Sequence, residues 1–124
     1  MTPDHPHAPP PSPILVQTFL GEAANFDGLN WQPFAPGIEI FRLYGNQKSG
    51  PSAAMLRYQP GASAPYHHHT GYEHVLVLRG SQSDERGEYP TGTLIINPPG
   101  VGHSIHSREG CVVLLIWERP VEFV

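Results

Sequence analysis

Several features are scarce in this 124-residue sequence, and each shortage excludes a class of protein. The single cysteine, Cys111, excludes an internal disulfide and a cysteine-rich zinc site. The 7 lysines and arginines against 11 acidic residues give a net charge of −4, which does not indicate a nucleic-acid-binding surface. No apolar run approaches the ~20 residues that span a bilayer, and no signal-peptide core is found. We therefore expect a cytoplasmic protein that binds neither nucleic acid nor a membrane.

Glycine and proline, by contrast, are abundant. The 13 glycines and 15 prolines make up more than a fifth of the chain and argue against a helical bundle, because both residues disfavour helix. Residues 1–13 hold six of the prolines, so we expect a disordered, proline-rich tail there. The remaining length fits one domain, which we predict to be all-β and to span 14–124.

Short segments of strand type follow one another about every ten residues, separated by glycine and proline turns. The segment 111–117 is continuously apolar and is predicted to be a strand buried on both faces. A hairpin is expected over 85–87, and 83–88 is interpreted as its solvated tip. The pattern predicts a sandwich or a barrel with strands at 14–20, 37–44, 52–59, 73–79, 93–97 and 111–117.

Histidine is the unusual residue type, with eight copies in the chain. In a strand His67 and His69 face the same way, and Glu73 shares their parity if the intervening turn keeps the register. His103 follows the rigid turn 98–100 and could supply a third imidazole. Imidazole nitrogen and carboxylate oxygen together suit first-row divalent metals. The alternatives are a solvent-exposed histidine patch or the remnant of a purification tag.

Two motifs of the cupin superfamily can be read in this region. The first motif, G-x5-H-x-H-x3-E-x6-G, is matched at every defined position from Gly61 to Gly80. The second, G-x5-P-x-G-x2-H-x3-N, is matched from Gly92 to His103, but Ser107 stands where the motif has asparagine. Both motifs occur in the right order, so the chain resembles a single-domain cupin. This resemblance implies a double-stranded β-helix, or jelly-roll barrel.

The stretch 60–111 resembles the cupin domain of the ChrR-type zinc anti-sigma factors, and acetylacetone dioxygenase is a more distant relative. The resemblance implies that one divalent metal ion per chain is bound by His67, His69, Glu73 and His103. The ChrR likeness favours zinc and the dioxygenase likeness favours iron, while manganese and nickel also suit these ligands. The chain lacks the H-x3-C-x2-C pattern of the anti-sigma zinc domain, so anti-sigma activity is not expected of it.

Two functions follow from these expectations. The first is a metal-dependent oxidoreductase of dioxygenase type, acting on a small oxygen-chelating metabolite such as a diketone or a hydroxy- or keto-acid. The second is a non-catalytic zinc cupin that serves as a ligand sensor or binding module; a purely structural metal domain is a third possibility. The strand predicted at 14–20 would have an unpaired edge, so we also expect a homodimer.

Five further residues have two interpretations each. His74 is expected at the surface, or else to act as a proton donor. His106 is also expected at the surface, or else as a hydrogen-bond partner of a metal ligand. Cys111 is expected to pack as a small apolar residue, or else to act as a reactive thiol. Arg57 and Arg79 are expected in surface ion pairs, or else as carboxylate-binding groups near the metal.

Overall fold

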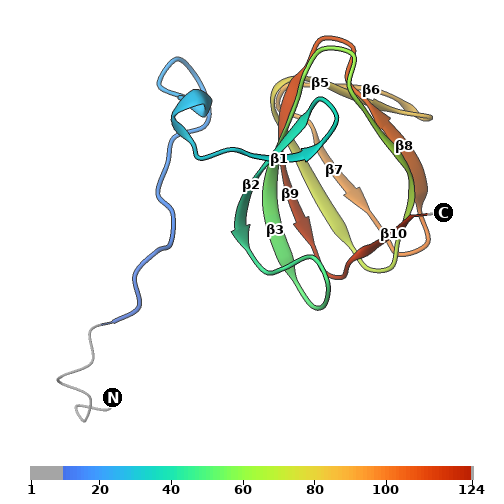
Figure 1. Cartoon of the computed structure of the whole chain (residues 1–124), viewed down its shortest axis with the longest axis horizontal. Coiled ribbons are helices and arrows are strands. Elements are labelled where there is room, and N and C mark those ends of the chain that lie inside the picture. Colours follow the sequence, from blue (N-terminus) through green and yellow to red (C-terminus); the bar gives the residue numbers. More distant parts are fainter. Residues whose placement is uncertain (1–9, 124) are drawn as a thin grey trace.

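The computed structural model describes residues 10–123 (Figure 1). The disordered tail predicted for 1–13 falls largely on residues 1–9, which lie outside the described residues. Residues 10–13 are exposed and have no regular secondary structure. The domain boundary at residue 14 therefore stays a prediction.

The described chain is built from antiparallel strands, which confirms the predicted all-β jelly-roll class. It contains one short 3₁₀ helix, η1 (Phe26–Gly28), and no helix in it is long and apolar enough to cross a membrane. The strands are β1 (Gln32–Ala35), β2 (Ile38–Tyr44), β3 (Ser52–Tyr58), β4 (Ser63–His69), β5 (Glu73–Asp84), β6 (Gly87–Pro90), β7 (Leu94–Asn97), β8 (Gly102–His106), β9 (Cys111–Trp117) and β10 (Val121–Phe123).

Strand β5 joins the two halves of the barrel. Its first part pairs with β9 and β7, and its last four residues pair with β6, so one strand passes from one half of the curled sheet into the other (Figure 1). A β-bulge between Val77 and Arg79 interrupts the pairing with β9. A bulge shifts the alternation of side chains by one residue. Inward-facing positions are therefore odd-numbered before the bulge, as at Glu73, and even-numbered after it, as at Asp84.

Two apolar clusters hold the sheet in place. The larger fills the barrel, and its most deeply buried members include Ile40, Val77 and Val113. The smaller lies on the outer face, where Phe26 packs with Met55, Leu78 and Val112. The strand predicted at 111–117 is thus buried on both faces over most of its length, although Ile116 is 39% exposed.

Most of the predicted strands are confirmed, but the one predicted at 14–20 is wrong. This segment forms no strand, and Ile14 and Val16 are 75% and 80% exposed. It runs outside the barrel in Figure 1, where no neighbouring strand accepts its backbone hydrogen bonds. An apolar run becomes a strand only where a partner pairs with it, so local pattern alone misassigned it.

Replacing Gly80 with alanine should destabilise the barrel strongly. Gly80 has φ 70°, and a Cβ there would meet the carbonyl oxygen of Gly110 and lie 3.0 Å from Cα of Cys111. Gly92→Ala is the matched control, because Gly92 has φ 91° and open space around its Cβ position. In urea unfolding we expect the free energy of unfolding to fall by about 1 kcal/mol in the control and by about 3 kcal/mol or more in Gly80→Ala. Equal losses would contradict a close approach at Gly80.

Candidate metal centre

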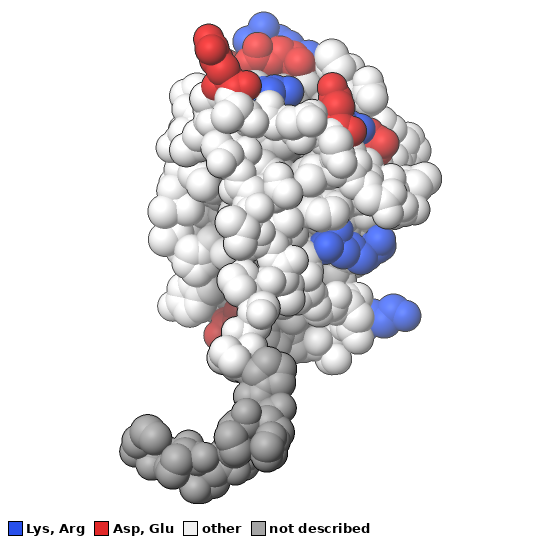
Figure 2. Space-filling model, turned by 90° about the vertical axis from the view of Figure 1, so that its left-hand side faces the viewer, with Lys and Arg blue, Asp and Glu red and all other residues white. Residues whose placement is uncertain are grey.

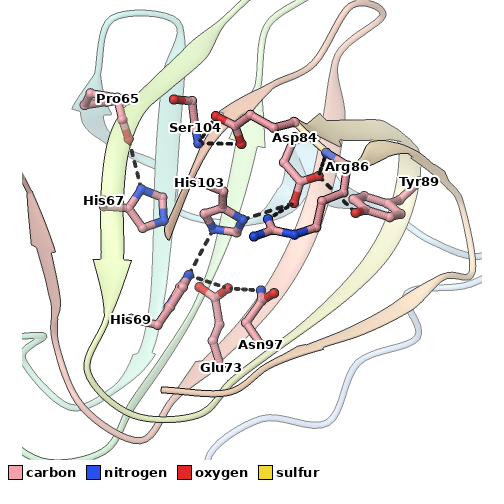
Figure 3. A network of polar contacts seen from close by, with 11 residues as sticks. Pro65, His67, His69, Glu73, Asp84, Arg86, Tyr89, Asn97, His103 and Ser104 are labelled. Carbon is pink, nitrogen blue, oxygen red and sulfur yellow. Dashed lines mark hydrogen bonds and ion pairs between the residues drawn. The ribbon is translucent and has the colours of Figure 1, made fainter. Parts of the chain in front are cut away.

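Three histidines and one glutamate converge inside the barrel from three strands. His67 and His69 lie on β4, His103 lies directly opposite His67 on β8, and Glu73 opens β5 (Figure 3). All four are buried, with exposed fractions of 2–7%, whereas His68 between the first two is only partly buried. The predicted alternation along β4 is therefore confirmed, and the exposed histidine patch is excluded.

The ring nitrogens of the three histidines lie close enough to share one ion. One nitrogen from each of His67, His69 and His103 falls within 4.8 Å of the others. Nε2 of His69 lies 2.9 Å from Nε2 of His103 and 3.3 Å from Oε1 of Glu73. Nitrogen ligands bind zinc at about 2.0–2.1 Å, so the two Nε2 atoms can both contact a single cation between them. The donor set thus fits a divalent metal.

Hydrogen bonds to residues outside the cluster orient two of the imidazoles. Nδ1 of His67 donates to the carbonyl oxygen of Pro65 at 2.9 Å, and Nδ1 of His103 donates to Oδ2 of Asp84 at 3.1 Å. A histidine whose Nδ1 carries the proton has its lone pair on Nε2. These two hydrogen bonds therefore leave Nε2 of both residues available as metal ligands.

Asp84 is the largest departure from the sequence interpretation. The segment 83–88 forms the predicted hairpin, and residues 85–88 are exposed as expected of its tip, but the Asp84 side chain is only 3% exposed. Its Oδ1 accepts hydrogen bonds from the backbone N–H of Arg86 at 2.8 Å and from the Tyr89 hydroxyl at 3.0 Å. Burial raises the pKa of Asp84, but these bonds and the one from His103 together lower it below its ordinary value. Asp84 therefore remains a carboxylate that holds His103 in place.

Glu73 is held by two neutral donors from other strands. Nδ2 of Asn97 donates to Oε1 at 3.0 Å, and Nε1 of Trp117 donates to Oε2 at 2.7 Å. Burial outweighs both hydrogen bonds and raises the pKa of Glu73 to about 7. The carboxylate is thus fixed in orientation but is costly to ionise without a cation beside it.

His67 and His69 are neutral near pH 7, which is the form of histidine that binds a metal. Burial, followed by the proximity of His103 and His67, lowers the pKa of His69 to about 4. Burial also lowers the pKa of His67, although its hydrogen bond to Pro65 opposes the shift. These two residues therefore present lone pairs rather than positive charge.

A cavity of about 70 Å³ lies against the cluster. His67, Glu73 and His103 form part of its wall, and most of the remaining wall is apolar. The cluster is therefore not packed on all sides by protein.

The other singled-out residues lie away from this cluster. His74 and His106 are exposed, and burial raises the pKa of the Cys111 thiol to about 11, as expected of an apolar-packed cysteine. Arg57 forms ion pairs with Glu39 and Asp27, and Arg79 lies over the ring of Phe26. On the face shown in Figure 2, acidic and basic side chains lie next to one another at the upper end.

The family is established by comparison. Residues 21–122 match the family described as "ChrR Cupin-like domain". Because the match spans most of the chain, the protein belongs to this cupin family, which confirms the resemblance inferred from the two motifs.

Individual relatives are more distant. The DNA damage-repair/toleration protein DRT102 of Arabidopsis thaliana is 27% identical over 74 residues, which cover 55% of this chain. The match covers only 24% of the plant protein, so this chain spans about a quarter of its length.

Two solved structures show the shared fold. A chain of the Rhodobacter sphaeroides SigE complex with the anti-sigma ChrR matches at TM-score 0.67 and 23% identity, over 75% of this chain and 51% of that chain. An acetylacetone dioxygenase from Acinetobacter johnsonii matches at TM-score 0.72 and 16% identity, over 89% of this chain and 82% of that chain. At these identities the two structures establish the fold alone.

Glu73→Gln should change how the stability of the metal-free protein depends on pH. A carboxyl whose folded pKa is raised from 4.5 to about 7 holds more protons folded than unfolded, so its contribution to stability falls as pH rises through that window. Glutamine removes this effect. As the pH rises from about 4.5 to 7, we expect the free energy of unfolding of the variant to increase by up to ~3 kcal/mol relative to that of the parent. Urea unfolding of chelator-treated protein measures this difference. A constant difference across this range would contradict the shift.

Asp84→Asn should weaken metal binding without unfolding the barrel. The change removes the charge that accepts the Nδ1 proton of His103, and loss of such a partner typically costs about 10–100-fold in metal affinity. Zinc competition against a chromophoric chelator measures the affinity. Glu88→Gln is the control, because Glu88 is an exposed acid of the same hairpin. An unchanged affinity in Asp84→Asn would show that Asp84 does not support the centre.

Proposed function

We propose that the protein is a metal-dependent enzyme of dioxygenase or related type, acting on a small oxygen-chelating metabolite. His67, His69, Glu73 and His103 would hold one divalent ion. The cavity beside three of these residues carries the proposal. A metal that only stabilises the fold needs no free space next to its ligands, whereas a substrate does.

The chemistry of the donors supports several metals. Three imidazole nitrogens and a carboxylate oxygen suit zinc, iron, manganese and nickel, and cellular supply contributes to the choice among them. When bound, the ion would supply Lewis-acid polarisation of a substrate oxygen and, if it is iron, redox chemistry.

The protein itself supplies orientation and a dry site. Asn97 and Trp117 fix both oxygens of Glu73, and Pro65 and Asp84 fix two of the imidazoles. Apolar walls keep bulk water away from the cavity, so charges inside it interact more strongly than in water. These residues position the ligands before any substrate arrives.

A second candidate function is a zinc-binding ligand sensor or binding module. The membership in the ChrR cupin-like family favours it, since the ChrR structure contains a sigma factor partner. The same cavity would then bind an effector without converting it.

A homodimer remains part of the proposal, although the strand at 14–20 no longer supports it. Strand β7 instead offers an interface. Within the described chain it pairs with β5 along one edge, and its other edge is unpaired. Its side chains Leu94 and Ile96 are 58% and 52% exposed. Packing of this face against a second copy would cover both side chains. The cytoplasmic location also stays a prediction.

Metal content tests the proposed ligand set. We expect about one divalent ion per chain in protein purified without a chelating column, and a loss of most of it in His67→Ala and His103→Ala, because each removes a nitrogen donor. Elemental analysis is the measurement. His74→Ala and His106→Ala are matched controls, since both histidines are exposed, and should keep the metal.

The bound element and the response to oxygen then separate the two functions. Iron-loaded protein that consumes oxygen with a diketone or a keto-acid supports the enzyme. Stoichiometric zinc with binding but no conversion of such compounds supports the sensor. Metal that persists unchanged in both His67→Ala and His103→Ala would contradict the ligand set.

A further inference from the structure

Gln82 is a buried amide that points into the cavity next to the metal centre. It lies on β5 after the bulge, is 3% exposed, and forms part of the cavity wall. Ser52 Oγ is the one fully enclosed side-chain polar atom without a partner in residues 10–123, so the amide of Gln82 is not sealed off inside the protein. An amide in the wall of a cavity can hydrogen-bond to a molecule inside that cavity.

The cavity continues toward a second hollow of about 210 Å³. Phe34, Trp117, Val121 and Phe123 line both spaces, so the two spaces are neighbours. Phe34 and Phe123 are 43% and 62% exposed and lie on the terminal strands β1 and β10. A ligand that outgrows the inner cavity can therefore extend into the outer hollow along an apolar wall.

The charges around both spaces limit the ligand. Among the described residues that line them there is no lysine or arginine, and Glu73 is the one acidic residue. A charged group of the ligand that lies in either space would therefore face mainly apolar side chains without a counter-ion, which is unfavourable. A negative charge on the ligand meets a cation only at its metal-facing end. Ser52 also lines the outer hollow, and its enclosed hydroxyl has no partner in the described chain.

The size of the inner cavity also limits the ligand. A buried water needs about 10–15 Å³ of such space, so 70 Å³ corresponds to roughly five or six non-hydrogen atoms. This is enough for a chelating head group but not for a long chain.

We propose that these two spaces bind a small oxygen chelator whose remainder is uncharged and mainly apolar, and that Gln82 recognises its head group by hydrogen bonding. The inference rests on the metal centre proposed above and narrows its substrate class. Chelators with a second, distal carboxylate are excluded from the site. Gln82 acts as a specificity-determining residue and not as a metal ligand.

The test uses metal-loaded protein and hydroxamates, which chelate through two oxygens. Nickel binding to the parent is measured first by elemental analysis. Calorimetry then compares hexanohydroxamate with the chelator of equal chain length that ends in a carboxylate. We expect the carboxylate-ended probe to bind at least about tenfold more weakly, because its distal charge would lie against apolar side chains without a cation.

Variants of Gln82 test its role. Gln82→Leu should keep its nickel and bind hexanohydroxamate about tenfold more weakly than the parent. Gln82→Met, an unbranched replacement, serves if the leucine variant does not fold. Gln59→Leu is the control, since Gln59 is exposed and lines neither space.

Each outcome has a defined meaning. Equal hexanohydroxamate affinity in the parent and the Gln82 variants would overturn the role of Gln82. Equal affinity for the two probes would overturn the exclusion of distal charge. Failure of the parent to take up nickel, zinc, iron or manganese would instead overturn the metal centre, and with it this inference.

Discussion

The main constraint on this structure is the free-energy cost of burying a carboxylate among imidazoles. Glu73 is 3% exposed, its hydrogen-bond donors are neutral, and burial raises its pKa to about 7. The imidazoles beside it are tied so that their lone pairs converge, with two Nε2 atoms 2.9 Å apart. Lone pairs and a carboxylate repel one another in an interior of low dielectric. A divalent cation at their centre would turn this repulsion into attraction, which is a physical reason in favour of the proposed metal centre.

The barrel is arranged to bring these groups together. β4 and β8 supply the histidines as neighbouring strands, and β5 supplies Glu73 before its bulge and Asp84 after it. The bulge beside Gly80 allows one strand to contribute to the cluster twice, once as a proposed ligand and once as the support of His103. A regular strand would place Asp84 on the outer face. The local irregularity of β5 is therefore a condition for the site.

Part of this could be predicted from the sequence. The spacing of His67, His69 and Glu73 follows the period of a strand, and glycine and proline turns located most strands. Asp84 could not be found in this way, because its inward orientation depends on the bulge in β5, which no residue pattern predicts. Asn97 and Trp117 were missed because their contacts to Glu73 span 24 and 44 residues. The segment 14–20 has a strand-like composition but no partner, so only the tertiary structure could exclude it.

The central claim is that His67, His69, Glu73 and His103 hold one divalent ion. It is tested most directly by anomalous diffraction from crystals of protein purified without a chelating column. The account predicts a single anomalous peak per chain within about 2.0–2.3 Å of the three Nε2 atoms and of a Glu73 oxygen, as metal–nitrogen and metal–oxygen bonds require. Ordered water at that position, in metal-supplemented crystals without an anomalous peak, would contradict the claim.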